Sequence, residues 1–171
     1  MKEIFYYNIS SNKKNFVLNV YALILTIISY IFFSFILNTK YFIVNNPIYF
    51  CILVIIMFVM YEIIKVIFFK IFKPNKKVKI KFGFGITYVS MPGEKFGKYQ
   101  YLIIVLSPFF IIFSILLFLK ASNIISASLC SILLAFHTGS SVVDLIYSYY
   151  IIKSDKNCVF EDTLDGFKIY K

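Results

Sequence analysis

The sequence predicts an all-α integral membrane protein: four transmembrane helices, a cytoplasmic β-hairpin between the second and third, and a small C-terminal hairpin. Of its 171 residues, 60% are hydrophobic, and the mean hydropathy is +0.83. A typical soluble domain is only about half apolar. The apolar residues also gather into four long runs, and a helix needs about 20 residues to cross a bilayer. We therefore expect a single membrane domain over residues 1–171.

The four apolar runs define the expected spans. The first, FVLNVYALILTIISYIFFSFIL, covers residues 16–37, and the second covers residues 48–72. The third covers residues 101–119 and has Pro108 in its interior, where a kink is expected. The fourth covers residues 124–152 and is expected to be one continuous span.

The lysines indicate the orientation of these spans. All 18 basic residues are lysines, and the net charge is +10. They concentrate in the N-terminal tail, in the loop between spans two and three and in the C-terminal tail. Positively charged loops mark the cytoplasmic side. We therefore expect a multi-pass protein of the cell membrane with cytoplasmic N- and C-termini. Lysines beside apolar spans suit the headgroups of a lipid bilayer. The absence of arginine, which provides bidentate base contacts, argues against nucleic acid as a partner.

Two polar segments have the alternation of β-strands. Residues 77–91, KVKIKFGFGITYVSM, alternate lysine with apolar side chains, and Gly83 and Gly85 can supply a turn. We expect a hairpin at the inner membrane surface, either without a ligand or with an open edge for an extended peptide. The tail 153–171 contains the turn pair Asp165-Gly166 between two short apolar runs, which favours a second hairpin.

Polar side chains inside two of the spans are the candidate functional residues. The second span contains Glu62 and Lys65, which share a helix face. In the fourth, polar residues at positions 0, 3, 4 and 7 from His137 also share one face if the helix is continuous. At about 1.5 Å per residue, Glu62, Lys65 and Asp144 lie roughly 21, 26 and 30 Å from the outer ends of their helices, so they can meet. The expected intramembrane polar cluster is Glu62, Lys65, His137, Ser140, Ser141 and Asp144.

Several motifs occur in an order that resembles a known family. They are Tyr61-Glu62-x-x-Lys65, Phe82-Gly83-Phe84, Ser107-Pro108, Gly139-Ser140-Ser141-Val142-Val143-Asp144 and the segment from Asp162-Thr163 to Tyr170. The chain resembles the membrane zincin peptidases, which are similar to the site-two-protease type of intramembrane metalloprotease. That resemblance implies a four-span fold, with Glu62 at the position of the general base and Asp144 at that of a third zinc ligand. The family's H-E-x-x-H motif is degenerate here, because Tyr61 and Lys65 stand at its two histidine positions.

The lysine changes what this site can bind. An ammonium group has no lone pair to offer zinc, which prefers imidazole, thiolate or carboxylate. At about 4 Å and an effective dielectric of about 20, two unit charges interact by about 4 kcal/mol, so a divalent ion beside Lys65 would meet about twice that in repulsion. We therefore expect no metal cofactor and assign no catalytic residue. Lys65 is expected to pair with Glu62, Asp144 or both in place of the metal.

His137 leaves an alternative open. It could join Glu62 and Asp144 as a metal ligand, and the cofactor would then be zinc. The commoner arrangement for a histidine inside a helix bundle is a hydrogen bond to a hydroxyl group or a backbone carbonyl.

Three functions follow from these observations. The first is a pseudopeptidase: a catalytically inactive zincin relative that binds or regulates a membrane partner, either a transmembrane segment or a peptide. The second is an active intramembrane metallopeptidase with altered metal ligands and Glu62 as general base. The third is a small accessory subunit of a transporter or a peptide-immunity protein. Whether the protein is an enzyme stays open at this point, and its metal content would discriminate best.

Overall fold

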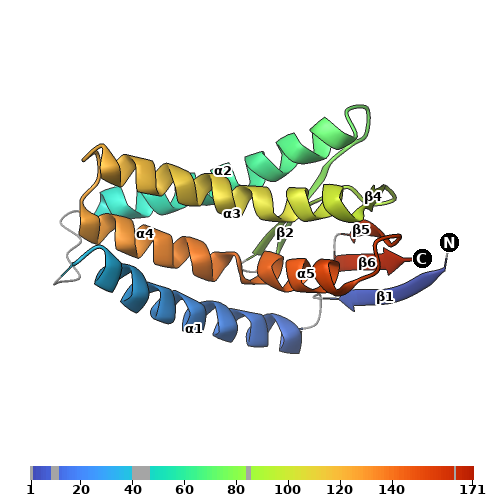
Figure 1. The fold of residues 1–171 in the computed structure, drawn as a ribbon, viewed down its shortest axis with the longest axis horizontal. Helices are drawn as coiled ribbons and strands as arrows, with labels where there is room; N and C mark the ends of the chain where they lie inside the picture. The colour runs from blue at the N-terminus through green and yellow to red at the C-terminus, as the bar shows by residue number, and fades with distance from the viewer. Residues whose placement is uncertain (1, 9–11, 40–46, 84–85, 164) are drawn as a thin grey trace. The chain divides into compact units, whose positions relative to one another are not determined.

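The computed structural model describes residues 2–8, 12–39, 47–83, 86–163 and 165–171 (Figure 1). These residues form the helices α1 (Asn12–Ile36), α2 (Pro47–Phe72), α3 (Lys98–Ala121), α4 (Ala127–Ser140) and α5 (Val142–Lys153). They also form the strands β1 (Glu3–Asn8), β2 (Lys79–Gly83), β3 (Ile86–Ser90), β4 (Lys95–Gly97), β5 (Val159–Thr163) and β6 (Gly166–Tyr170). The chain divides into two compact units. Unit 1 comprises Met1–Phe16, Glu62–Pro108 and Asp144–Lys171, and unit 2 comprises Val17–Tyr61 and Phe109–Val143.

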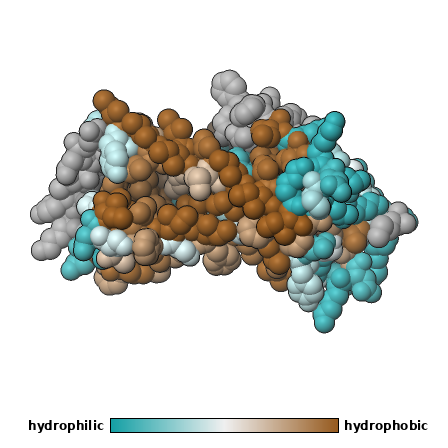
Figure 2. All heavy atoms as spheres, turned by 90° about the horizontal axis from the view of Figure 1, so that it is seen from above, coloured by the Kyte–Doolittle hydropathy of each residue, from teal (hydrophilic) through white to brown (hydrophobic). Residues whose placement is uncertain are grey.

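The helices are those of a membrane protein. Three are long and apolar enough to cross a bilayer: Lys13–Ile36, Pro47–Phe72 and Lys98–Ala121. α4 and α5 together meet the same criterion if the pair counts as one bent span. The described residues therefore provide three spans, or up to four. Large apolar side chains are exposed along these helices, and Figure 2 shows them as a broad hydrophobic surface. In water that surface would be costly, whereas lipid solvates it.

The expected fourth span, residues 124–152, does not form one continuous helix. α4 ends at Ser140, α5 begins at Val142, and the two helices meet at 53°. The hydroxyl groups of Ser140 and Ser141 both donate to the carbonyl oxygen of His137, at 2.9 and 2.8 Å. Such short side chains compete with the helical hydrogen bonds of the backbone and favour a break. The 0, 3, 4, 7 spacing from His137 therefore does not describe one continuous helix face.

Unit 1 contains a four-stranded antiparallel sheet in the order β1-β6-β5-β4. β5 and β6 form the hairpin expected in the tail 153–171, with Thr163 opposite Gly166. In the N-terminal tail, Glu3–Asn8 form β1 and pair with β6. Gly166 permits this contact: its φ is +145°, and a Cβ atom there would lie 1.8 Å from the carbonyl oxygen of Tyr7. Both tails are thus held in one sheet.

The segment 77–91 forms an antiparallel hairpin, as its alternation indicated. β2 pairs with β3 from Lys79 opposite Ser90 to Gly83 opposite Ile86. The turn residues 84–85, which include Gly85 and the second phenylalanine of Phe82-Gly83-Phe84, lie outside the described residues. The location of this hairpin at the cytoplasmic surface stays a prediction.

Aromatic side chains attach the sheet of unit 1 to its helices. Phe69 of α2 contacts Phe96 of β4, with ring centroids 5.5 Å apart. Tyr101 of α3 stacks on Phe160 of β5 at 5.5 Å, and Tyr147 of α5 contacts Phe167 of β6 at 4.4 Å. These rings are buried or nearly so. The sheet therefore fixes the ends of α2, α3 and α5, which carry the candidate site.

Candidate functional site

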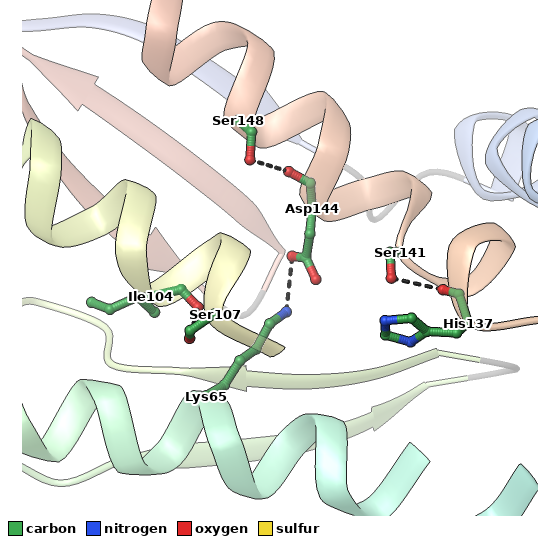
Figure 3. Close-up of polar contacts among 7 residues, drawn as sticks. All are labelled: Lys65, Ile104, Ser107, His137, Ser141, Asp144 and Ser148. Carbon is green, nitrogen blue, oxygen red and sulfur yellow. Dashed lines mark hydrogen bonds and ion pairs between the residues drawn. The ribbon is translucent and has the colours of Figure 1, made fainter. Parts of the chain in front are cut away.

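An ion pair between helices α2 and α5 is the centre of the candidate site. Lys65 of α2 donates from Nζ to Asp144 Oδ1 of α5 over 2.9 Å (Figure 3). Only 17% of the lysine side chain and 8% of the aspartate side chain are exposed. The expectation that Lys65 pairs with an acid is therefore met by Asp144. Both residues belong to unit 1.

The break between α4 and α5 positions the acid of this pair. Because α5 begins at Val142, Asp144 lies in its first turn. The N-terminus of a helix carries a partial positive charge, which stabilises a carboxylate in that turn. The hydroxyl group of Ser148 donates to the backbone carbonyl of Asp144 at 2.8 Å. A continuous span would have placed the same carboxylate in mid-helix, without this stabilisation.

Glu62 lies one helical turn before Lys65 on α2. Its charge and that of Asp144 both act on Lys65. Its Oε2 atom is buried and has no hydrogen-bond partner among the described residues. A buried carboxylate oxygen without a hydrogen bond is costly, so the Oε2 atom of Glu62 is a destabilising group beside the ion pair.

Asp162 is a member of this cluster that the sequence reading placed only within a motif. Strand residues two apart share a face, so Asp162 on β5 follows the buried Phe160 toward the helices. Burial raises the pKa of Asp162 well above 3.8; Lys65 opposes this effect, whereas the acids Asp144 and Glu62 add to it. In the sequence, the two-residue spacing from Phe160 indicates that Asp162 shares its strand face. That inference requires knowing that Val159–Thr163 is a strand paired in the sheet.

Ser107, the residue before Pro108, compensates for a hydrogen bond that the proline cannot make. Proline has no N–H group, so Pro108 cannot donate to the carbonyl of Ile104 four residues earlier. The hydroxyl group of Ser107 donates to that carbonyl at 3.3 Å (Figure 3). The Ser107-Pro108 motif thus keeps α3 intact next to its proline.

His137, Ser140 and Ser141 belong to unit 2, and their contacts lie within it. The Nε2 atom of His137 is 2.9 Å from the carbonyl oxygen of Phe109, and since a carbonyl only accepts, Nε2 donates. The buried imidazole stacks on Phe109 at 5.3 Å and meets the ring of Tyr61 edge-on at 5.8 Å. The hydrogen bond to a backbone carbonyl is the commoner arrangement expected for this histidine.

The donor set around Lys65 does not fit zinc. In the part of the chain that the structure describes, no group of three or more His, Cys, Asp or Glu side chains could hold a metal ion. An ammonium group bonded to Asp144 cannot coordinate a metal and repels a cation.

Comparison with known proteins places the chain in a family. The model of a family described as "Putative zincin peptidase" matches residues 54–159, which is more than half of the chain. The chain belongs to this zincin peptidase family. The matched region contains Tyr61, Glu62, Lys65, His137 and Asp144, and it ends before Asp162. No curated protein and no solved structure matches the chain. The family membership indicates a peptidase-related protein.

The raised pKa of Asp162 gives a direction of pH dependence. The unfolded chain releases this proton near pH 3.8, whereas the folded protein releases it only at higher pH. The stability contributed by the protonated acid is therefore complete below about pH 3.8 and is lost as the pH rises through the folded pKa. We expect the melting temperature of the detergent-solubilised protein to fall over that window. Asp162→Asn should remove this decline, and the exposed Asp155→Asn should keep it. An Asp162→Asn profile parallel to the wild-type one would contradict this assignment.

Removing the lysine should leave a buried acid without its counter-ion. We expect Lys65→Met to lower the free energy of unfolding by about 3–5 kcal/mol, the typical cost of breaking a buried pair. Denaturation in mixed micelles measures it. The exposed Lys156→Met is the matched control and should change stability by less than about 0.5 kcal/mol. The double variant Lys65→Met, Asp144→Leu should recover most of the loss, and equal stability of Lys65→Met and wild type would refute the pairing.

Proposed function

We propose that the protein is a catalytically inactive, site-two-protease-like member of the zincin peptidase family that binds or regulates a membrane partner, either a transmembrane segment or a peptide. The observation that carries the proposal is the 2.9 Å bond from the Lys65 ammonium to Asp144. It supports a fixed positive charge at the position where the family holds its metal. Tyr61 and Lys65 replace both histidines of the H-E-x-x-H frame.

Loss of the metal removes the chemistry without removing the fold. Zinc in a peptidase polarises the scissile carbonyl and activates water, and neither tyrosine nor a paired ammonium does this. Recognition of a peptide depends on shape and backbone contacts, which are separable from the reacting centre. The chain matches its family over residues 54–159, and the Lys65–Asp144 pair joins α2 to α5 within unit 1. A retained scaffold without a metal supports binding as the function.

The lysines support the orientation of this protein in the membrane. Within the described residues, basic side chains occur in β2 and β4, at the ends of α2 and α5 and in β6. By the positive-inside rule, both termini and the β2–β3 hairpin lie in the cytoplasm. The partner would then meet the protein inside the cell membrane or at its cytoplasmic surface.

Restoring the two histidines tests the loss of the metal. Histidines at positions 61 and 65 would lie at i and i+4 of α2, on one helix face, and position 65 is the one that contacts Asp144. We expect the purified wild-type chain to contain far less than one zinc per molecule. The double variant Tyr61→His, Lys65→His should approach one, measured by inductively coupled plasma mass spectrometry.

The single variant Tyr61→His is the matched control, because it keeps the ammonium group. It should stay near the wild-type zinc content. Stoichiometric zinc in the wild-type protein, removed by Glu62→Gln, would contradict the proposal and favour the active peptidase.

Photo-crosslinking in native membranes tests the partner. Ile63 is 45% exposed on α2, between Glu62 and Lys65. A photoreactive amino acid at this position should yield a discrete adduct with one protein or peptide. The same group at Phe35, which is 86% exposed on α1, is the control and should label lipid. Lipid adducts alone at both positions would count against a partner at the candidate site.

A further inference from the structure

The lysines of unit 1 differ in what their ammonium groups contact. Some pair with acids of the chain itself, as in Lys76–Glu94, Lys168–Glu3 and Lys171–Asp155. Three others have exposed side chains and form no ion pair with an acid of the described residues: Lys13, Lys153 and Lys156. These three, which we call the lysine patch, lie at the start of α1 and at or just after the end of α5.

Strand β1 connects the start of α1 with the last turns of α5 (Figure 1). Lys14 of α1 donates from Nζ to the carbonyl oxygen of Asn8 over 3.0 Å, and its ammonium group lies 5.8 Å from the centre of the Tyr7 ring. The same ring contacts Tyr147 and Tyr150 of α5, at 6.0 and 5.5 Å between ring centroids. All of these residues belong to unit 1. The two parts of the lysine patch are therefore brought to the same region of unit 1.

Large apolar side chains are exposed next to the lysine patch. Phe16 lies one turn after Lys13 on α1 and is 69% exposed. Tyr149 lies one turn before Lys153 on α5 and is 58% exposed, and Ile152 is 62% exposed. Residues three or four apart share a helix face. A lysine stem can follow such apolar surface into lipid while its ammonium group stays at the level of the headgroups, where aromatic side chains also gather.

We propose that the start of α1 and the end of α5 form a binding site for one anionic phospholipid. The lysine patch binds the phosphate of the headgroup, and the exposed apolar side chains beside it contact the acyl chains. The Lys65–Asp144 pair takes no part in this site. The lipid is therefore a ligand separate from the membrane partner of the proposed function.

Charge selects the kind of headgroup. Asp155 lies between Lys153 and Lys156 in the sequence, but its carboxylate is already paired with Lys171 over 2.5 Å. The lysine patch therefore presents three positive charges without an acid partner among the described residues. A zwitterionic headgroup has no net charge to offer, whereas an anionic headgroup does. Each lysine near an anionic membrane surface strengthens binding by about fivefold.

The apolar side chains distinguish a lipid from a soluble phosphate. A free phosphate ion gains nothing from Phe16 or Ile152, and salt screens its attraction to exposed lysines. A phospholipid is held by its acyl chains, so its headgroup is already at the depth where the helices end. The acyl chains also cover apolar surface that is costly in water. Lysines and apolar side chains in one region therefore favour a lipid.

Native mass spectrometry of the full-length chain in a neutral detergent tests the proposal. Phosphatidylglycerol is the anionic probe, and phosphatidylcholine with the same acyl chains is the zwitterionic probe. The wild-type chain should bind one phosphatidylglycerol at least about tenfold more tightly than phosphatidylcholine. Inorganic phosphate at the same concentration should not displace the lipid. Equal affinity for the two lipids, or displacement by inorganic phosphate, would overturn the proposal.

Two double variants locate the site. Lys13→Gln with Lys153→Gln should weaken phosphatidylglycerol binding by about 25-fold, fivefold for each lysine, and leave phosphatidylcholine binding unchanged. Lys77→Gln with Lys79→Gln is the matched control, because both lysines are exposed and belong to unit 1 outside the lysine patch. The control should change the affinity by less than about twofold. Equal losses in the two double variants would indicate general charge attraction and would overturn the assignment.

All four substituted lysines are exposed, so both double variants should keep the circular dichroism spectrum of the wild type. None of these measurements bears on zinc content, so failure here is distinguishable from failure of the proposed function.

Discussion

The contact between Lys65 and Asp144 is the constraint on which the rest of unit 1 depends. Neither charge is stable alone between apolar helices, since an isolated ion there costs several kcal/mol. The two charges belong to segments 79 residues apart in the sequence, so helices α2 and α5 must be held in register. The aromatic contacts of Phe69, Tyr101 and Tyr147 with the sheet do this from the end of the unit. The sheet therefore supports the ion pair, and it also provides hydrogen-bond partners for the backbone of the N- and C-terminal segments.

The helix break next to Asp144 also stabilises the ion pair, because it places the acid in the first turn of α5. A break inside an apolar span exposes backbone groups that lipid cannot satisfy. The carbonyl of His137 accepts from the backbone N–H of Ser141 and from the hydroxyl groups of Ser140 and Ser141, and α5 gains an N-terminus at the acid. On α3, the hydroxyl group of Ser107 compensates for the missing N–H group of Pro108. Serine hydroxyl groups thus bond to backbone carbonyls at both places where regular helix is interrupted.

The sequence was sufficient for those features that depend on local pattern or on depth. Hydropathy located the long helices, alternation located the β2–β3 hairpin, and depth along the helices indicated that Lys65 and Asp144 can meet. The pairing of β1 with β6 was missed because it joins the two ends of the chain, and no local pattern encodes such a partner. Asp162 was missed for the same reason, since only the sheet brings β5 to the helices. The break at Ser141 was missed because hydropathy carries no information about the hydrogen bonds that serine hydroxyl groups make.

The charges of the cluster show why a lysine among these acids has consequences beyond the pair. A divalent ion balances two carboxylates, whereas one ammonium balances a single carboxylate. Glu62, Asp144 and Asp162 all interact with Lys65, so three acids share one positive charge. Two of these acids lie on helices α2 and α5, and the third lies on β5. Burial raises the pKa of Asp162 above its ordinary value; Lys65 opposes this effect, and Asp144 and Glu62 add to it. Asp162 interacts with Lys65 and both helix acids, so the strand that carries it is part of the site.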